Sequence, residues 1–286
     1  MSDSKQVVVF GGFDDIRSRD LRFLEEAAKL GAVTVLVWPD DLTEQATGAP
    51  PKFPLAERDY FLNAVRYVNR VVQFGGHNDP DSLPEIPGFR AHTWADMESR
   101  ASPARGIFCR EHGICYRVFK MDELKGFPEP LSSSSAPRGK KVIVSGSYDW
   151  LHSGHIRFLE EAKKTGGLGA RLIVIVASDE TVTRLKGRPP VIPDNQRRAL
   201  VEALKVVDEA VIGFRDLDME KVLTRVKPDI VAVGHDQGEI EDEVKRVTMQ
   251  KRLKIRVERI GRFGPNDLNS SSKIKRRIVE GLGKRP

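Results

Sequence analysis

The sequence lacks the features of several protein classes. It has two cysteines in 286 residues, too few for a disulfide-stabilised scaffold, which favours a reducing compartment. It has no run of 18 or more apolar residues, so we expect no transmembrane helix. The first ten residues, MSDSKQVVVF, have neither the basic region nor the long apolar core of a signal peptide. These absences predict a cytoplasmic protein.

The chain also has little net charge outside its last residues. The formal charge is +6, yet residues 273–286 carry six basic side chains and one acidic side chain. That basic segment contains no aromatic residue on which a base could stack. A basic terminal helix is most often a solvated surface, so we expect no nucleic-acid partner.

An internal repeat organises the chain. Residues 11–31 align without gaps to residues 146–166, and eleven of the twenty-one positions are identical. After a small offset, residues 50–72 parallel residues 189–211. Self-similarity over this length indicates a duplicated domain.

A segment rich in Pro and Ser, FPEPLSSSSAPRGKK, separates the two repeats. Its composition is typical of a linker. We expect a first domain over residues 1–128, a linker over 129–139 and a second domain over 140–286. Residues 75–106 have little periodicity, and we expect them to form long loops of the first domain.

Strand and helix patterns alternate in each half. In the second half the expected strands are 141–146, 171–178, 208–213 and 229–234, and the expected helices are 155–166, 195–207, 218–228 and 270–283. Continuous Val and Ile runs separated by helices indicate a parallel sheet covered on both faces. We therefore predict an α/β fold, with two tandem Rossmann-like parallel-sheet domains packed as a pseudo-dimer. In such sheets, ligands bind beyond the carboxyl ends of the strands.

The first strand of the second half is followed by SYDWLHSGH. The strand ends at Gly146, and a helix begins near the second histidine, where free N–H groups attract phosphate. Gly154 lets the backbone approach a ligand closely. His152 and His155 can donate hydrogen bonds to a phosphorus centre as its charge grows. No Cys, Asp or Glu at ligand spacing completes a metal set with them, so we predict no metal site held by the protein.

The HSGH motif after GSYDWL resembles the HxGH signature of the cytidylyltransferase-like family. This family includes glycerol-phosphate, choline-phosphate and ethanolamine-phosphate cytidylyltransferases and archaeal-type FAD synthases, and the resemblance covers residues 140–280. It implies a nucleotidyltransferase in which an acceptor phosphate attacks the α-phosphorus of an NTP and releases pyrophosphate. It also implies Mg²⁺ bound with the NTP.

The resemblance implies a role for individual residues. The implied catalytic residues are His152, His155 and Lys186. The implied nucleotide-binding residues are Gly146, Ser147, Tyr148, Asp149, Gly154, Arg197, Gly234, Asp236, Ser270, Ser271, Ser272 and Lys273. Lys186 is expected in a flexible loop, from which it can reach the α-phosphate as a mobile charge. Relatives carry an arginine shortly before the Ser run, whereas here Arg262 precedes Ser270 by eight residues, which leaves the choice between CTP and ATP open.

Three functions remain possible for the second domain. We expect transfer of CMP to a small phosphorylated acceptor such as phosphoethanolamine or glycerol phosphate, because the tandem plan is similar to that of ethanolamine-phosphate cytidylyltransferases. The alternative enzyme is an FMN adenylyltransferase that uses ATP, since VGHDQ and KGRPP resemble archaeal-type FAD synthases. The alternative from another class is a non-catalytic nucleotide-binding scaffold. The expected partners are small molecules, and the expected state is a monomer with an internal pseudo-dimer or a homo-oligomer.

The first half has lost the residues of this motif. Arg17 and Asp20 replace the two histidines, Arg19 replaces the glycine between them, and Thr47 replaces the lysine. An Asp at the second histidine position would repel a triphosphate. We therefore expect the first domain to be catalytically silent.

Overall fold

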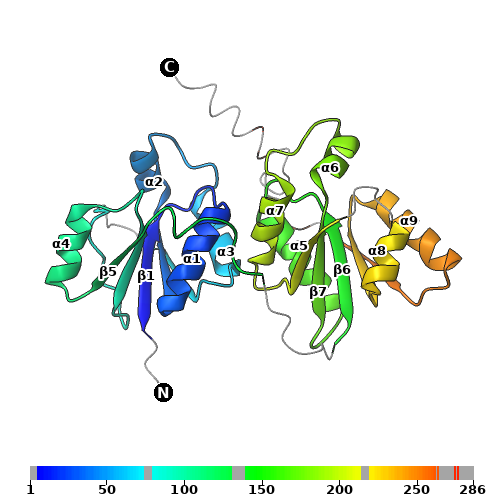
Figure 1. The fold of residues 1–286 in the computed structure, drawn as a ribbon, viewed down its shortest axis with the longest axis horizontal. Helices are drawn as coiled ribbons and strands as arrows, with labels where there is room; N and C mark the ends of the chain where they lie inside the picture. The colour runs from blue at the N-terminus through cyan, green and yellow to red at the C-terminus, as the bar shows by residue number, and fades with distance from the viewer. Residues whose placement is uncertain are drawn as a thin grey trace. The chain divides into compact units, whose positions relative to one another are not determined.

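The computed structural model describes residues 5–73, 79–130, 139–213, 219–261, 263, 274 and 276. The chain divides into two compact units between Pro128 and Glu129. Each unit contains one five-stranded sheet with helices packed against it (Figure 1). No helix in the described ranges is long and apolar enough to cross a membrane.

The first unit alternates strands and helices. In chain order its elements are β1 (Gln6–Gly11), α1 (Ser18–Leu30), β2 (Ala32–Val37), α2 (Asp40–Thr47), α3 (Leu55–Ala64), β3 (Arg70–Gln73), β4 (Thr93–Met97), α4 (Pro103–Glu111) and β5 (Cys115–Phe119). All strand pairs are parallel, and the strand order is β3-β2-β1-β4-β5.

The second unit follows the same plan. Its elements are β6 (Lys141–Gly146), α5 (Ser153–Thr165), β7 (Arg171–Val176), α6 (Asp179–Lys186), α7 (Asp194–Glu202), β8 (Glu209–Ile212), α8 (Met219–Val226), β9 (Ile230–Gly234), α9 (Gly238–Gln250) and β10 (Arg256–Ile260). Its parallel sheet has the order β10-β9-β6-β7-β8, which is the order of the first sheet when the strands are numbered within the unit. The prediction of two Rossmann-like α/β domains is confirmed, whereas their packing as a pseudo-dimer stays a prediction.

Strand order explains where a ligand can enter the second unit. The chain moves outward in one direction from β6 to β7 and β8, and in the other from β6 to β9 and β10. Where the strand order reverses, the loops that follow the two neighbouring strands lead to opposite sides of the sheet. They leave a crevice between them at the carboxyl edge of the sheet. This crevice lies between the ends of β6 and β9.

The hydrophobic core of the second unit holds this edge in place. Strand side chains pack against helices α8 and α9 through a buried cluster that consists of Ile143, Ile173, Ile175, Val231, Val233, Leu223, Val244 and Val247. Full burial of each such side chain contributes roughly 1.5–3 kcal/mol. The sheet is therefore a rigid base for the loops at its carboxyl edge.

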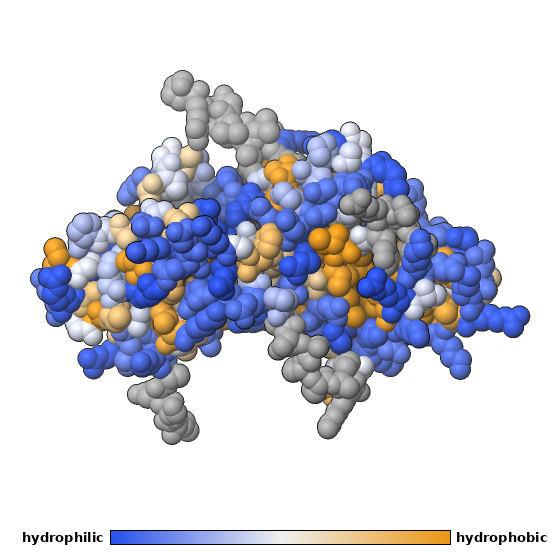
Figure 2. Space-filling model, viewed as in Figure 1, coloured by the Kyte–Doolittle hydropathy of each residue, from blue (hydrophilic) through white to orange (hydrophobic). Residues whose placement is uncertain are grey.

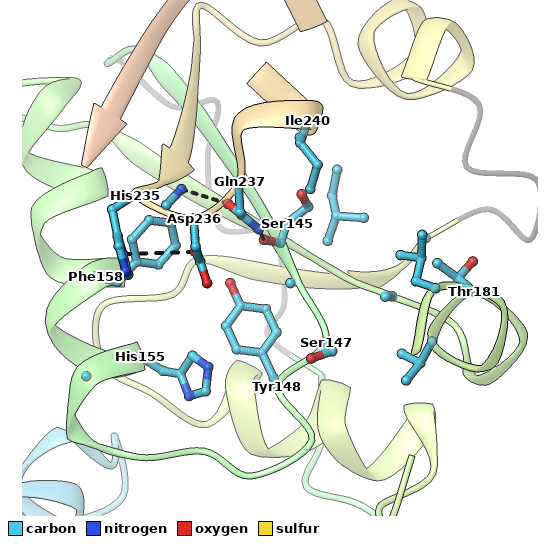
Figure 3. Close-up of a pocket in the computed structure, with 18 of the residues that line it drawn as sticks. Ser145, Ser147, Tyr148, His155, Phe158, Thr181, His235, Asp236, Gln237 and Ile240 are labelled. Carbon is cyan, nitrogen blue, oxygen red and sulfur yellow. Dashed lines mark hydrogen bonds and ion pairs between the residues drawn. The ribbon is translucent and has the colours of Figure 1, made fainter. Parts of the chain in front are cut away.

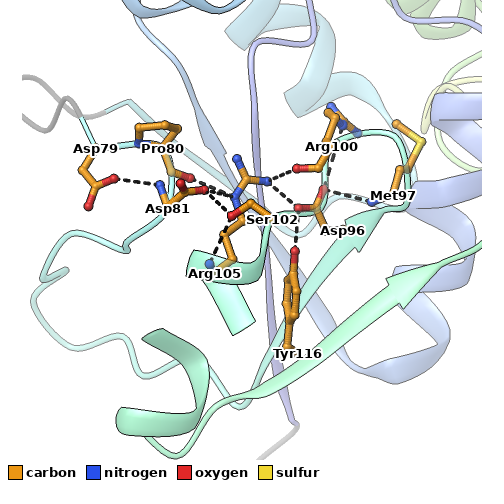
Figure 4. Close-up of polar contacts among 9 residues, drawn as sticks. All are labelled: Asp79, Pro80, Asp81, Asp96, Met97, Arg100, Ser102, Arg105 and Tyr116. Carbon is orange, nitrogen blue, oxygen red and sulfur yellow. Dashed lines mark hydrogen bonds and ion pairs between the residues drawn. The ribbon is translucent and has the colours of Figure 1, made fainter. Parts of the chain in front are cut away.

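The sequence pattern missed several elements. Helices α6 and α9 and strand β10 were not predicted, and residues 75–106 contain strand β4 and the start of α4 rather than loops alone. Strand β4 was hidden because Asp96 interrupts its apolar pattern. That carboxylate is buried and forms an ion pair with Arg105, and it accepts a hydrogen bond from the Tyr116 hydroxyl at 3.2 Å (Figure 4). A carboxylate can be buried in a strand only when folding brings partners to it. In the sequence, an Asp among apolar residues therefore looks like part of a loop.

Candidate active site

The turn after β6 places an aromatic ring over a glycine. Tyr148 has φ +48°, a conformation that bulky residues rarely adopt. A Cβ atom on Gly146 would lie 2.9 Å from two carbon atoms of the Tyr148 ring. Glycine is therefore required at position 146 for the ring to fold back over the end of β6.

Two residues that were predicted to bind the nucleotide, Asp149 and Arg197, hold this turn in place through hydrogen bonds to backbone groups, and we call them the braces of the turn. The Asp149 carboxylate accepts hydrogen bonds from the backbone N–H groups of Val191 at 2.7 Å and Ile192 at 3.0 Å. Arg197 is fully buried, and it donates to the carbonyl oxygens of Ser147 and Ile192 and pairs with the Asp179 carboxylate at 2.6 Å. Neither side chain lines the cavity described below. The placement of Asp149 and Arg197 does not support contact with the nucleotide, because their polar atoms are committed to protein partners.

The first unit contains the same braces. Asp14 accepts hydrogen bonds from the N–H groups of Lys52 at 2.8 Å and Phe53 at 2.9 Å. Arg58, the counterpart of Arg197, is buried and donates to the carbonyl oxygens of Phe53 and Gly12. Residues that both halves keep therefore hold the turn, whereas those that differ between the halves are candidates for chemistry.

The two histidines stand side by side at the start of α5. His152 is the N-cap residue of this helix, in an extended backbone conformation, and His155 lies in its first turn. Their ring centroids are 3.8 Å apart, and the His152 residue is 5% exposed. The structure thus brings together the pair that the motif predicted.

Burial keeps both imidazoles uncharged. It lowers the pKa of His152 to about 4. The pKa of His155 lies well below its usual range, mainly because of burial; repulsion from His152 and Lys186 adds to the effect, and a hydrogen bond to the Trp150 backbone partly opposes it. The Nδ1 atoms of both rings have no hydrogen-bond partner in the described part of the chain. Two neutral rings of this kind can donate hydrogen bonds to an anionic ligand.

Lys186 adds a positive charge beside the histidines. It is the last residue of helix α6, and Gly187 ends the helix in a left-handed conformation. The expected flexible loop is therefore wrong for Lys186 itself. Its Nζ atom donates a hydrogen bond to the Ser147 hydroxyl at 2.9 Å, which places the ammonium group over the turn after β6.

A clamp joins the ends of β6 and β9. The Gln237 Oε1 atom accepts a hydrogen bond from the Gly234 N–H at 2.7 Å, and its Nε2 atom donates to the Ser145 carbonyl at 3.0 Å (Figure 3). Asp236 and His235 lie beside it, with their Oδ1 and Nδ1 atoms 3.9 Å apart. Sequence reasoning gave Gln237 no role, although it follows β9 at the carboxyl edge of the sheet.

These elements enclose a cavity of about 580 Å³. Nine of the predicted site residues line it, namely Gly146, Ser147, Tyr148, Gly154, His152, His155, Lys186, Gly234 and Asp236. Apolar residues from β7, α6, α8 and α9 form another part of the lining, which we call the apolar side, namely Ile175, Val182, Leu185, Met219, Val222 and Ile240. Apolar side chains also gather on the visible face of the second unit (Figure 2). A cavity of this size, with apolar lining and a few polar groups, is typical of a site for a small molecule.

Sequence reasoning did not find the apolar side. Its residues come from four separate elements, two of which were not predicted. Ser270, Ser271, Ser272 and Lys273, together with Arg262, lie outside the described residues.

The corresponding place in the first unit is occupied by charged side chains. Arg17 forms an ion pair with Asp15 at 2.8 Å, and its backbone N–H donates to Asp20. The Arg100 guanidinium lies 5.4 Å above the Phe13 ring, and its Nη1 atom is 2.9 Å from where a Cβ atom on Gly11 would be. This arrangement has no imidazole pair.

Comparisons with known proteins agree with the motif. The family model described as Cytidylyltransferase-like matches residues 143–277. An FAD synthase from Methanopyrus kandleri is 44% identical over 142 residues, which are 50% of this chain and 93% of that protein. An FAD synthase from Aciduliprofundum boonei is 43% identical over 140 residues, which are 49% of this chain and 91% of that protein. A crystal structure of a lipopolysaccharide core biosynthesis protein from Thermoplasma volcanium is 36% identical, covering 44% of this chain and 99% of that one, with a TM-score of 0.39.

These relatives correct the expected substrates. CMP transfer to phosphoethanolamine or glycerol phosphate is wrong as the main expectation, because the curated relatives at 40–45% identity are FAD synthases. The matches span about half of this chain. The tandem arrangement similar to ethanolamine-phosphate cytidylyltransferases therefore stays a prediction.

Proposed function

The chain belongs to the cytidylyltransferase-like family of nucleotidyltransferases, and on this basis we propose that its second unit is an FMN adenylyltransferase. In the proposed reaction, a phosphate oxygen of FMN forms a bond to the α-phosphorus of ATP. The bond between the α-phosphorus and the bridging oxygen of pyrophosphate breaks, and the products are FAD and pyrophosphate. The observation that carries the proposal is the pair of adjacent histidines beside Lys186 in the cavity wall, both with a pKa well below the ordinary value.

The histidines would act as fixed hydrogen-bond donors. Charge grows on the oxygens of the α-phosphorus in the transition state, and donors that are already oriented stabilise it without reorganisation. Neutral imidazoles serve this purpose because each ring carries one N–H group. His152 and His155 would therefore contact the reacting phosphate, and Gly154 between them would leave room for it.

Lys186 would supply the positive charge for the same phosphate. An ammonium group is a compact point charge with three donors, and in this chain it already lies over the turn at Ser147. Ser147, Gly146 and Gly234 would line the phosphate and ribose path. Asp236 is at the rim, close to the expected position of the base or acceptor.

The residues present fit a magnesium ion that arrives with ATP. Mg²⁺ usually keeps several waters and binds through one or two carboxylates together with substrate phosphates. The described part of the cavity wall offers one carboxylate, Asp236, and no group of three metal-ligating side chains was found among the described residues. When bound, the ion would neutralise the departing pyrophosphate.

The apolar side of the cavity favours FMN over a small phospho-alcohol. Phosphoethanolamine has almost no apolar surface to bury, whereas a flavin ring is flat and aromatic. Burying apolar surface contributes roughly 25 cal/mol for each Å². Apolar lining residues beside the histidines and Lys186 therefore suit FMN better than a small phospho-alcohol.

A pyrophosphate-release screen tests the proposal. ATP and CTP are each combined with FMN, phosphoethanolamine, phosphocholine and glycerol phosphate, and FAD formation is followed by chromatography. We expect turnover with ATP and FMN only. Turnover with CTP and a phospho-alcohol, or none with any pair, would contradict the proposal.

We also propose that the first unit is catalytically silent. Its Asp20 and Arg17 stand where the histidines stand in the second unit, and they are paired with each other and with Asp15. In the chain with His152→Ala and His155→Ala, FAD formation should fall at least as far as in His155→Ala alone, and adding Arg17→Ala and Asp20→Ala in the first unit should lower it no further. A further fall would reveal activity of the first unit and contradict this part of the proposal.

A further inference from the structure

Among the described residues of the cavity wall, three buried polar atoms have no hydrogen-bond partner. The Tyr148 hydroxyl and the Nδ1 atoms of His152 and His155 make no hydrogen bond within the described ranges. Almost all buried polar groups in native proteins are paired, and an unpaired one costs about 1–3 kcal/mol. The proposed chemistry accounts for the histidines but leaves the tyrosine hydroxyl unexplained.

The position of Tyr148 is fixed by its surroundings. The residue is 2% exposed, and its ring lies against Gly146 and 5.3 Å from the His155 ring between centroids. Its hydroxyl end points toward the loop that carries Asp236 and away from Ser147 (Figure 3). The hydroxyl therefore lies at the crevice between the ends of β6 and β9, where nucleotides bind in open parallel sheets.

The first unit supplies a natural comparison. Phe13 occupies the equivalent position of the repeat, with φ +49° and 7% exposure. The ring and the unusual backbone conformation are thus present in both units, which shows that the fold needs the ring and not the hydroxyl. The hydroxyl is present in the unit that has the histidine pair and absent from the unit that lacks it.

We propose that the Tyr148 hydroxyl donates a hydrogen bond to an oxygen of the bound nucleotide and thereby holds the transferred nucleoside monophosphate in line with the acceptor. This inference rests on the proposed function of the second unit. Burial raises the pKa of Tyr148 above its ordinary value, so the phenol stays protonated and acts as a donor rather than a base. The accepting oxygen belongs either to the ribose or to the α-phosphate, since both types of oxygen lie along the nucleotide between the histidines and the base.

The test is Tyr148→Phe in the full-length chain, assayed with ATP and FMN. We expect kcat/KM for ATP to fall roughly tenfold to a hundredfold, the effect of losing one hydrogen bond to a polar or charged ligand atom. The variant should keep its melting temperature, because Phe13 already adopts this conformation in the same chain. The matched control is Phe13→Tyr in the first unit, which should leave FAD formation unchanged.

Deoxynucleotides identify the accepting oxygen. If the Tyr148→Phe penalty disappears with 2′-deoxy-ATP or 3′-deoxy-ATP, the partner is the missing ribose oxygen. If the penalty is the same with both analogues as with ATP, the partner is the α-phosphate. Either result supports the inference when Tyr148→Phe keeps the melting temperature of the wild type, because a structural defect is then excluded.

Two outcomes separate this inference from the proposed function. If the wild type forms FAD and Tyr148→Phe has the same kcat and KM for ATP, the role of the hydroxyl is refuted and the proposed function stands. If the wild type forms no FAD, the proposed function is refuted. In that case, calorimetric measurement of ATP affinity tests whether the Tyr148 hydroxyl contacts the nucleotide. Equal Kd values for wild type and Tyr148→Phe would overturn the inference.

Discussion

Stability below neutral pH should depend on His152. In the folded protein its pKa is about 4, because burial disfavours the charged ring. In the unfolded chain the ordinary value of about 6.5 applies. As the pH falls below 6.5, the unfolded state binds the proton first, so the free energy of unfolding decreases until the pH reaches about 4. Above pH 6.5 the ring is neutral in both states and has no effect on the pH dependence.

The size of this effect follows from the two pKa values. A difference of one pKa unit corresponds to about 1.4 kcal/mol, so the full loss is about 3 kcal/mol, and about 2 kcal/mol is already lost at pH 5 relative to pH 8. The variant His152→Gln removes this titration. Its free energy of unfolding should therefore fall less steeply over the same range. The carboxylates contribute similarly to both proteins, and the loss of repulsion from His152 raises the pKa of His155, which changes the slope in the same direction.

Native-state hydrogen exchange is the suitable assay because it separates the two units. Amides in β6 and β7 that exchange only through unfolding report the stability of the second unit. We expect wild type to lose about 2 kcal/mol more than His152→Gln between pH 8 and pH 5. Parallel pH dependences in the two proteins would show that His152 is solvated and charged in the folded state, which would refute the reasoning about its neutral ring.

Three further substitutions test other parts of the site. His155→Ala should lower kcat by roughly a hundredfold to a thousandfold and change KM much less, since the ring acts in the transition state; an intact kcat would remove His155 from the mechanism. Arg197→Met should destabilise the second unit by several kcal/mol, because buried carbonyl groups lose their donors at about 1–3 kcal/mol each. The control Arg198→Met removes a partly exposed ion pair and should cost less than about 1 kcal/mol. Equal melting temperatures for the two variants would contradict the bracing role of Arg197. Gly146→Ala should weaken ATP binding, because the new Cβ atom would lie 2.9 Å from the rigid ring of Tyr148. The control Gly11→Ala should be tolerated, because its Cβ atom would meet the flexible end of the Arg100 side chain at the same distance. Calorimetry with ATP and melting temperatures of both variants test this difference.

Local features of the site could be predicted from the sequence. The repeat, the alternation of apolar strands with amphipathic helices and the HSGH motif are all patterns over short stretches of chain. Two residues three positions apart at the start of a helix lie on neighbouring parts of its surface. The proximity of His152 and His155 therefore followed from spacing alone.

The roles of the charged residues that recur in both repeats could not be predicted in this way. Arg197 and Asp149 match the family motif, and on that ground they were expected at the nucleotide. Whether such a side chain faces a ligand or the protein depends on contacts with residues forty to fifty positions away. The comparison of the two units, in which both braces recur, shows that they serve the turn.

Periodicity and spacing in the sequence were enough to predict the fold class, the duplication and the proximity of His152 and His155, because each of these depends on short stretches of chain. The contacts of Gln237 with β6 and β9, and the apolar residues that line the cavity, became visible only in the folded chain. These features depend on which elements meet at the carboxyl edge of the sheet. The order of the strands and the packing of α6, α8 and α9 decide which elements lie together there. Both depend on long-range contacts that no short stretch of sequence encodes.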